Sequence, residues 1–344
     1  MPGIIIVTPF HKRQRGNSIS SSRLQRGLTG KGFKVKLISL EEDNWLSQLQ
    51  LTVAGGEYDV IHAFHALHLA MILKALPEIR EMPLVLTTTG TDINYDLKGA
   101  GQDAVLSAFK AVQGIVVFNE YFCEVIKEYF PGAEEKLVTI PQGVALEKKT
   151  GKSRSKTGSF ENEIVFLLPS GLRPVKNINL AIDALQKVRQ KCPAIRLLIM
   201  GAAIDDRYSQ DITERIAGLD WISYLGEIPH EEMGSWLQVG DVVINSSLSE
   251  GQPQGALEAM SLGKPCILTA VPGNLGIIQS GVEGFYVKNE VEMAEAAERL
   301  IRDDMLREEM RQAARKLVES RFTAEGELEA YQRLYLEVTR EGLH

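Results

Sequence analysis

The residues of this chain best suited to chemistry gather in residues 246–274, which read SSLSEGQPQGALEAMSLGKPCILTAVPGN. Two acidic residues in this segment, Glu250 and Glu258, stand eight positions apart. Along a helix that separation is about 12 Å, which is too far for two carboxylates to share one proton or one metal ion comfortably. The spacing instead favours a site that binds the two ends of one elongated, hydroxyl-rich ligand.

The same segment predicts an anion site at the start of a helix. A strand candidate at 242–245 leads into a loop, Pro253 stands near the first helical turn, and Gly263 stands near the helix end. Free N–H groups and the partial positive charge at a helix N-terminus suit a phosphate. Glycines let the backbone approach such a ligand closely. The residues expected to line this site are Gly251, Gln252, Pro253, Gln254 and Gly255.

Two cations mark a second candidate site in residues 169–177, PSGLRPVKN. Arg173 and Lys176 follow a strand candidate at 163–168 and stand where a helix begins. The carboxyl ends of parallel strands commonly carry ligand sites, and cations placed there can neutralise the charge of a departing diphosphate. The alternative is that both are ordinary exposed cations near a helix start.

Short apolar runs alternate with helical stretches along the chain, a pattern typical of parallel βαβ units and open doubly wound sheets. A basic, polar stretch at 148–160 interrupts the alternation, as a linker or loop would. We therefore expect an α/β protein with domains at 1–150 and 161–320 and a final helical segment at 321–344. The expected strands are 4–7, 34–38, 59–63, 83–87, 114–118, 163–168, 195–200, 221–224, 242–245 and 266–269.

Composition narrows the function classes. The 344 residues carry a formal net charge of −7, so a generally basic surface for nucleic acid is not expected. Three widely separated cysteines give neither a zinc-ligand spacing nor a CxxC pair. We find no run near the roughly 18 apolar residues of a membrane span, and no secretory signal order at the start. These features predict a cytoplasmic protein without a transmembrane segment and leave its oligomeric state open.

Residues 246–274 resemble the signature of retaining glycosyltransferases of family 4, which have the GT-B fold. The resemblance lies in the pattern SEGxPxxxLEAMxxGKPxI and in the GN pair at 273–274. It implies two Rossmann-like domains with parallel sheets facing across a cleft, the N-terminal one for the acceptor and the C-terminal one for a UDP- or GDP-linked sugar. The final helix would return to the first domain. A phosphate oxygen of the donor can act as base, so neither a metal nor another cofactor is implied.

The resemblance also implies roles for residues on the donor side. Glu250 would contact hydroxyls of the donor sugar, Glu258 would hold the nucleotide ribose, and Arg173 with Lys176 would bind the diphosphate. The family's usual arginine stands five residues before the lysine, where this chain has Gly171, so Arg173 is expected to substitute. Residues 221–241 resemble a family stretch in which a turn meets the nucleotide base, here through backbone groups of Glu227 and Ile228.

In the N-terminal half, residues 9–17 (PFHKRQRGN) follow the first strand, where relatives have a glycine loop near the diphosphate and the acceptor. Gly16 and Asn17 fit that loop. The basic residues Arg13 and Arg15 are unusual there and suit a small anionic acceptor, because opposite charge raises the local concentration of such a ligand. A solvated basic turn is the alternative.

The loop at 86–92 (LTTTGTD) has Thr89 where the family commonly has a histidine near the reacting sugar. A hydroxyl can hydrogen-bond but cannot carry the charge of an imidazolium. His62 and His65 are candidates to compensate, or they serve only as structural histidines. Asp92 of the same loop is a further candidate on the sugar or acceptor side.

The chain has GN at 16–17, GTDxNxD at 90–96, GLRxVK at 171–176, SSxSEG at 246–251 and PGN at 272–274. Together these motifs resemble the glycosyltransferase 1 domain-containing protein 1 subgroup over nearly the whole chain. More loosely, the chain resembles bacterial selenosugar synthases, which share the GN and TGTD features. We therefore expect a glycosyltransferase that moves a hexose or N-acetylhexosamine from a nucleotide sugar to a small-molecule acceptor. Three alternatives stay open. They are a selenosugar or thiosugar synthase using UDP-N-acetylglucosamine, a catalytically silent nucleotide-sugar-binding protein, and a nucleotide-sugar epimerase of the same fold.

Overall fold

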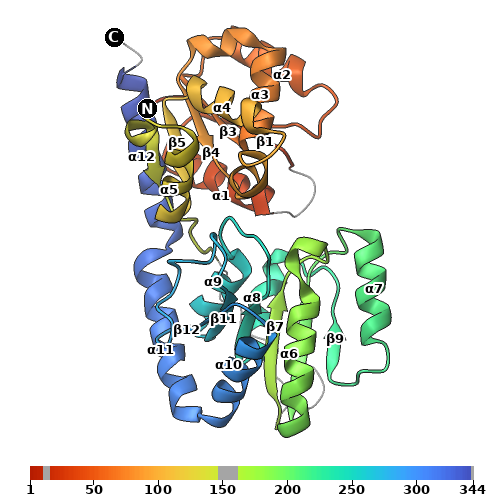
Figure 1. Cartoon of the computed structure of the whole chain (residues 1–344). Helices are drawn as coiled ribbons and strands as arrows, with labels where there is room; N and C mark the ends of the chain where they lie inside the picture. Colours follow the sequence, from red (N-terminus) through yellow and green to blue (C-terminus); the bar gives the residue numbers. More distant parts are fainter. Residues whose placement is uncertain (11–15, 146–161, 342–344) are drawn as a thin grey trace. The chain divides into compact units, whose positions relative to one another are not determined.

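The computed structural model describes residues 1–10, 16–145 and 162–341. The chain divides into two compact units, each built on its own sheet (Figure 1). The first unit contains Met1–Gly143 together with Ala324–His344, and the second contains Val144–Thr323.

The first unit has a six-stranded parallel sheet in the order β2-β1-β3-β4-β5-β6. The strand order reverses between β1 and β3, which is the position where doubly wound sheets open toward ligands. Its strands are β1 (Ile4–Thr8), β2 (Val35–Ser39), β3 (Val60–Phe64), β4 (Leu84–Thr87), β5 (Gly114–Val117) and β6 (Leu137–Thr139). Its α-helices are α1 (Gly16–Gly30), α2 (Trp45–Ala54), α3 (Ala66–Ala75), α4 (Gln102–Ala111), α5 (Glu120–Tyr129) and α12 (Ala324–Glu341).

The second unit repeats this design with a six-stranded parallel sheet in the order β12-β11-β10-β7-β8-β9. Its strands are β7 (Ile164–Pro169), β8 (Ile195–Met200), β9 (Ile222–Tyr224), β10 (Val242–Asn245), β11 (Cys266–Thr269) and β12 (Gly284–Val287). Its α-helices are α6 (Ile178–Lys191), α7 (Asp206–Ile216), α8 (His230–Val239), α9 (Gln254–Ser261), α10 (Glu290–Arg302) and α11 (Asp304–Arg321).

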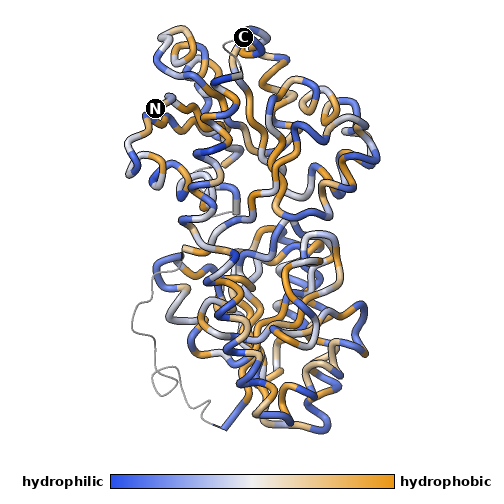
Figure 2. The backbone as a smooth tube through the Cα atoms, turned by 90° about the vertical axis from the view of Figure 1, so that its left-hand side faces the viewer, coloured by the Kyte–Doolittle hydropathy of each residue, from blue (hydrophilic) through white to orange (hydrophobic). Residues whose placement is uncertain are grey.

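The two parallel sheets confirm the expected α/β architecture, and burial explains why they form. The central strands are continuous apolar runs with buried side chains, as parallel strands covered on both faces require. Helices cover both faces, so apolar segments lie inside each unit and polar segments at its periphery (Figure 2). Within the described ranges, the helices are too short or too polar to cross a membrane.

Helix α12 packs on the first unit and shares its core. Its buried face, formed by Leu328, Tyr331, Leu334, Tyr335 and Val338, contacts the strands and α1. Leu328 lies so close to α1 that a Cβ added at Gly27 would be 3.1 Å from its methyl carbons. The same pair of helices is joined by a buried, two-bond ion pair of 2.8 and 2.9 Å between Arg23 and Glu327.

Candidate active site

Glu250 lies in the loop between β10 and α9, where hydrogen bonds hold its carboxylate. Its Oε1 accepts bonds from Lys176 Nζ at 2.6 Å, Ser247 Oγ at 2.7 Å and Asn245 Nδ2 at 2.9 Å. The Glu250 and Lys176 side chains are only 9% and 15% exposed, so the pair is largely shielded from water. Two residues singled out separately in the sequence therefore meet in the structure.

The pKa of Glu250 is set by opposing effects. Burial raises it, whereas the charge of Lys176 and the hydrogen bonds from Lys176, Ser247 and Asn245 lower it, and the net result is a pKa below its ordinary value. Glu250 is therefore an ionised carboxylate at neutral pH. Such a group accepts hydrogen bonds from hydroxyls and is not a proton donor.

The turn after β11 packs against the Glu250 loop. Gly273 is buried, and a Cβ added there would overlap the carbonyl group of Glu250 and lie 2.8 Å from its Cβ. The fully buried Asn274 donates from Nδ2 to Asn245 Oδ1 at 3.1 Å and to Thr269 O at 2.8 Å. Gly273 and Asn274 thus help to place Glu250 and its partner Asn245. The sequence signature includes this GN pair but gives no hint of the close backbone approach.

Helix α9 begins at the expected place, directly after Pro253. Gly255 packs against the end of β7, where an added Cβ would lie 2.9 Å from the last carbonyl oxygen of that strand. This close packing brings the start of α9 next to the loop that follows β7. Glu258, about one turn further along, is buried, as is Gln252, whereas Gly251 is half-buried.

Arg173 stands between β7 and a short 3-10 helix, Pro174–Lys176. Its Nε is buried and has no hydrogen-bond partner in the part of the chain that the structure describes. A buried donor without a partner is costly, and an anion would satisfy it. At Gly171, the position that the resemblance gives to the usual arginine, an added Cβ would lie 2.5 Å from Ile204 Cδ1, which would have to move.

The turn after β9 contains the residues expected near a nucleotide base. Gly226 has a φ of +71° and accepts a 2.8 Å bond from the backbone N–H of Gly201, which joins this turn to the end of β8. Ile228 is buried and Glu227 is exposed. The turn therefore lies at the carboxyl edge of the sheet, as the sequence predicted.

In the first unit, Asp92 ties the loop after β4 to the start of α3. Its Oδ1 accepts 2.9 Å bonds from the backbone N–H groups of Thr89 and Gly90, and its Oδ2 accepts a 3.1 Å bond from Ala66 N. Asp92 is fully buried. These contacts favour a structural role for Asp92, which shapes the loop that carries Thr89.

His62 is a core residue on β3, and both of its ring nitrogens have partners. Nδ1 lies 2.7 Å from Tyr335 Oη, and Nε2 lies 2.7 Å from Thr87 Oγ1, which in turn lies 2.8 Å from Tyr331 Oη. Burial lowers the pKa of His62 to about 3, so the ring is neutral. Of the two interpretations that the sequence left open, this environment favours the structural one.

This network predicts a stability effect without a direct effect on ligand binding. Tyr335→Phe would leave one nitrogen of the buried His62 without its partner, so the free energy of unfolding should fall by about 1–3 kcal/mol. Chemical unfolding at neutral pH measures it. Tyr129→Phe is the control, because Tyr129 is only partly buried at the end of α5. Equal stabilities of Tyr335→Phe and the parent protein would contradict the prediction.

Three of the other N-terminal candidates lie within the described residues, and two do not. Gly16 and Asn17 lie in the first turn of α1. Arg13 and Arg15 lie outside the described residues. His65 lies between β3 and α3, with Nε2 3.0 Å from Thr91 Oγ1.

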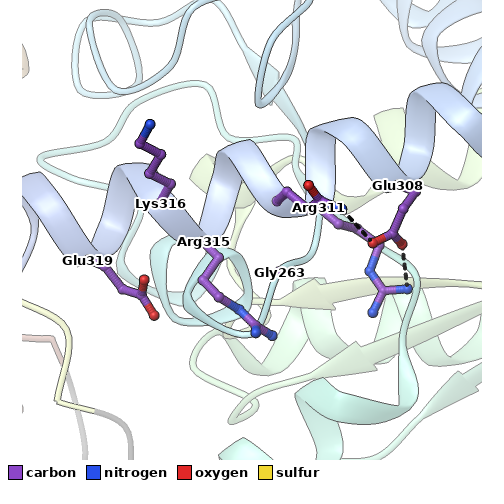
Figure 3. A pocket seen from close by; sticks show the side chains of 7 residues that line it. Gly263, Glu308, Arg311, Arg315, Lys316 and Glu319 are labelled. Atoms are coloured by element: carbon purple, nitrogen blue, oxygen red, sulfur yellow. Dashed lines mark hydrogen bonds and ion pairs between the residues drawn. The ribbon is translucent and has the colours of Figure 1, made fainter.

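A cavity of about 260 Å³ lies elsewhere in the second unit, between α11 and the turn after α9 (Figure 3). Arg315 points toward the turn at Gly263, Arg311 pairs with Glu308, and Lys316 points away from them. The lining mixes both signs of charge and includes none of the candidate site residues. Among the described side chains we find no group of three or more His, Cys, Asp or Glu suited to a metal ion.

Comparisons with known proteins add an independent line of observation. Residues 149–317 match the family model described as glycosyl transferases group 1. The chain is 28% identical over 266 residues to glycosyltransferase 1 domain-containing protein 1 of Xenopus tropicalis, which covers 74% of this chain and 76% of that protein. It is 26% identical over 299 residues to N-acetyl-alpha-D-glucosaminyl L-malate synthase of Bacillus anthracis, with 82% and 76% covered.

Among solved structures, Anabaena HepE in complex with UDP and glucose has a TM-score of 0.81 at 18% identity. The match covers 98% of this chain and 100% of that one. At this identity the likeness concerns the fold, and it extends over both sheets.

Proposed function

We propose that this glycosyltransferase, which carries a group 1 glycosyl transferase domain on a GT-B fold, retains the donor's anomeric configuration. The resemblance of residues 246–274 to the family 4 signature supports retention. The donor is a UDP- or GDP-linked hexose or N-acetylhexosamine. In the reaction the bond from the anomeric carbon to the diphosphate breaks, a bond to the acceptor forms on the same face, and a phosphate oxygen takes the acceptor proton. The nucleotide sugar is a substrate, and no resident metal or cofactor takes part.

The observation that carries this proposal is the shielded carboxylate of Glu250 at the carboxyl end of β10, held by Lys176. An ionised carboxylate fixed beside a helix N-terminus is suited to orient sugar hydroxyls while the helix start receives the diphosphate. Arg173, whose Nε lacks a partner among described residues, supplies the second cation. Glu258 holds the ribose, and the turn at Glu227 meets the base.

The first unit receives the acceptor in this proposal. Its small-molecule acceptor is anionic and is held partly by Arg13 or Arg15, in keeping with the basic loop of an otherwise acidic chain. The Bacillus anthracis relative is named for transfer to L-malate, a small hydroxyl-bearing anion. The cysteine pattern supports a cytoplasmic setting.

A differential thermal-shift screen tests the donor class. UDP-glucose, UDP-N-acetylglucosamine and GDP-mannose are compared, because a ligand at 100 times its Kd should stabilise the protein by about 2.7 kcal/mol. The member that stabilises most then serves as the donor probe in turnover assays with L-malate, thiophosphate or glucose as acceptor. A retained anomeric configuration in the product, read by NMR, is the expected result; inversion would exclude the retaining mechanism.

The same assay separates the alternatives. Transfer to thiophosphate with no transfer to L-malate favours the thiosugar or selenosugar synthase, and an epimerised nucleotide sugar without acceptor favours the epimerase. Stabilisation by a nucleotide sugar without hydrolysis or transfer favours the silent binding protein. Thr89 and the shifted Arg173 are the two features that favour this last alternative.

The ribose assignment gives a prediction for nucleotide binding. Glu258→Ala removes a buried carboxylate from α9 and should weaken UDP and the donor probe alike by about tenfold, because a hydrogen bond to a charged group is worth about 1.5–3 kcal/mol. Calorimetry with UDP measures the Kd. The control is Glu231→Ala, which alters an exposed glutamate at the start of α8. Unchanged UDP binding in Glu258→Ala would remove Glu258 from the ribose site.

A further inference from the structure

The backbone of His65 is strained, although a glycine at this position would avoid the strain. Its φ of 75° and ψ of 122° lie in a region that side-chain-bearing residues rarely adopt. Among the described non-glycine residues only His65 and Asn177 have a positive φ. Asn177, at φ 44° and ψ 50°, occupies the left-handed region that asparagine tolerates.

The strain arises because His65 is the single residue between the end of β3 and the start of α3. Its N–H donates to Thr87 O at 2.9 Å, which continues the pairing of β3 with β4, and its carbonyl accepts from Leu69 N at 3.1 Å in the first turn of α3. Glycine would make this turn without a steric penalty. A histidine in this place therefore indicates that its side chain has a use that offsets the strain.

His65 is buried, with 9% of the residue exposed, and only one of its two ring nitrogens has a hydrogen-bond partner among the described residues. Its Nε2 lies 3.0 Å from Thr91 Oγ1 and 3.7 Å from Asp96 Oδ2. A carboxylate on this side favours the tautomer with the proton on Nε2, which leaves a lone pair on Nδ1. That Nδ1 is buried and has no hydrogen-bond partner in the described ranges, which is costly unless a ligand supplies a donor.

His65 stands at the carboxyl end of β3, where sheets of this type commonly bind ligands. It follows β3 directly, and the strand order of this sheet reverses between β1 and β3. Ligands of doubly wound sheets bind outside the carboxyl ends of the strands at this point. The Asp92 carboxylate ties the neighbouring Thr89 loop to the start of α3, so the imidazole sits in a fixed frame.

We propose that His65 contacts the acceptor, with Nδ1 accepting a hydrogen bond from the attacking hydroxyl as the acceptor binds. When the bond to the anomeric carbon forms, that proton passes to the phosphate oxygen of the leaving diphosphate, and the imidazole stays neutral. Thr91 and Asp96 are positioning residues: they fix the orientation of the ring and favour the tautomer with the proton on Nε2. The acceptor is thereby a molecule whose nucleophile is a hydroxyl, and water takes the same place when the donor is hydrolysed. This inference rests on the proposed function and adds a substrate-contacting residue to it.

The experiment uses His65→Gly and His65→Asn in the full chain. Glycine adopts the φ and ψ of His65 without strain, asparagine keeps a small polar side chain there, and neither offers an imidazole lone pair. We expect hydrolysis of the donor probe and transfer to L-malate to fall at least about tenfold, the size of one lost hydrogen bond to a reacting group. The Kd of UDP should stay within about twofold in both variants, and the apparent Tm of His65→Gly should be unchanged or higher, because glycine relieves the strain.

His68→Asn is the matched control. It removes the neighbouring imidazole, whose ring centroid lies 4.8 Å from that of His65, from an ordinary helical position. We expect it to lower the apparent Tm slightly and to leave turnover within about threefold, since its backbone is not strained and asparagine is a poorer helix former than most residues.

The outcomes separate this inference from the proposed function. If the parent protein neither hydrolyses nor transfers any of the three nucleotide sugars, the proposed function fails. If the parent is active and both His65 variants keep full turnover, only the His65 assignment fails. Loss of turnover with a Tm several degrees lower in both variants would show that His65 has a structural role, and would overturn the inference as well.

Discussion

Gly273→Ala should lower sugar transfer by about 10²-fold while the protein still folds. An added Cβ would overlap the carbonyl carbon and oxygen of Glu250, and these are backbone atoms that cannot rotate away. The Glu250 loop must therefore shift, and a displacement near 1 Å of a substrate-positioning group can cost this much in rate. Steady-state turnover of the donor probe, together with its Kd and the apparent Tm, measures the effect.

Gly276→Ala provides the control three residues along the same turn. Its φ of +78° makes alanine strained there, but no atom lies within 4 Å of the added Cβ. Gly276→Ala should therefore lose roughly 1 kcal/mol of stability through its strained backbone. Gly273→Ala should lose stability through its overlap with Glu250, and only Gly273→Ala should lose turnover. Similar turnover in the two variants would mean that the contact between Gly273 and Glu250 does not position the catalytic loop.

The sequence predicted every interior strand and two of the four edge strands, β2 and β9. Residues 195–200, 242–245 and 266–269 form strands with the expected bounds, because interior parallel strands must be continuous apolar runs. The other two edge strands, Leu137–Thr139 and Gly284–Val287, were missed. Each has a neighbour on one side only and is partly exposed, so neither needs such a run.

The sequence predicted which residues form the candidate site and that they follow strands. It did not predict which of these residues contact one another. Glu250 and Lys176 were assigned to different parts of a ligand, yet they pair across 74 positions of sequence. A hydrogen bond between loops of two strands depends on the sheet order, which motif spacing does not contain. The strain at His65 is similarly invisible, since the letters DVIHAFHALH do not state that a strand and a helix meet at one residue.

The second large effect is expected at Lys176. Lys176→Met should lower turnover about 10²–10³-fold, because it removes a charge that stabilises the leaving diphosphate. It should also lower the free energy of unfolding by about 3–5 kcal/mol at pH 7, because the buried Glu250 carboxylate loses its counter-charge. Turnover and chemical unfolding measure the two effects separately.

The pH dependence and a second substitution distinguish the structural from the catalytic contribution of this pair. In the parent protein the pKa of Glu250 is lowered, so its stabilising contribution is present above the unfolded-state pKa of about 4.3 and is lost as the pH falls through the lower folded-state value. In Lys176→Met burial acts without the cation and raises that pKa, so the stability deficit should shrink as the pH falls from 7 toward about 4.5.

Lys176→Met/Glu250→Gln should recover much of the stability, because no buried charge remains, yet turnover should stay low. Recovery of turnover together with stability would show that the pair serves only the fold, and a deficit that grows on acidification would show that Glu250 is not the group left unpaired.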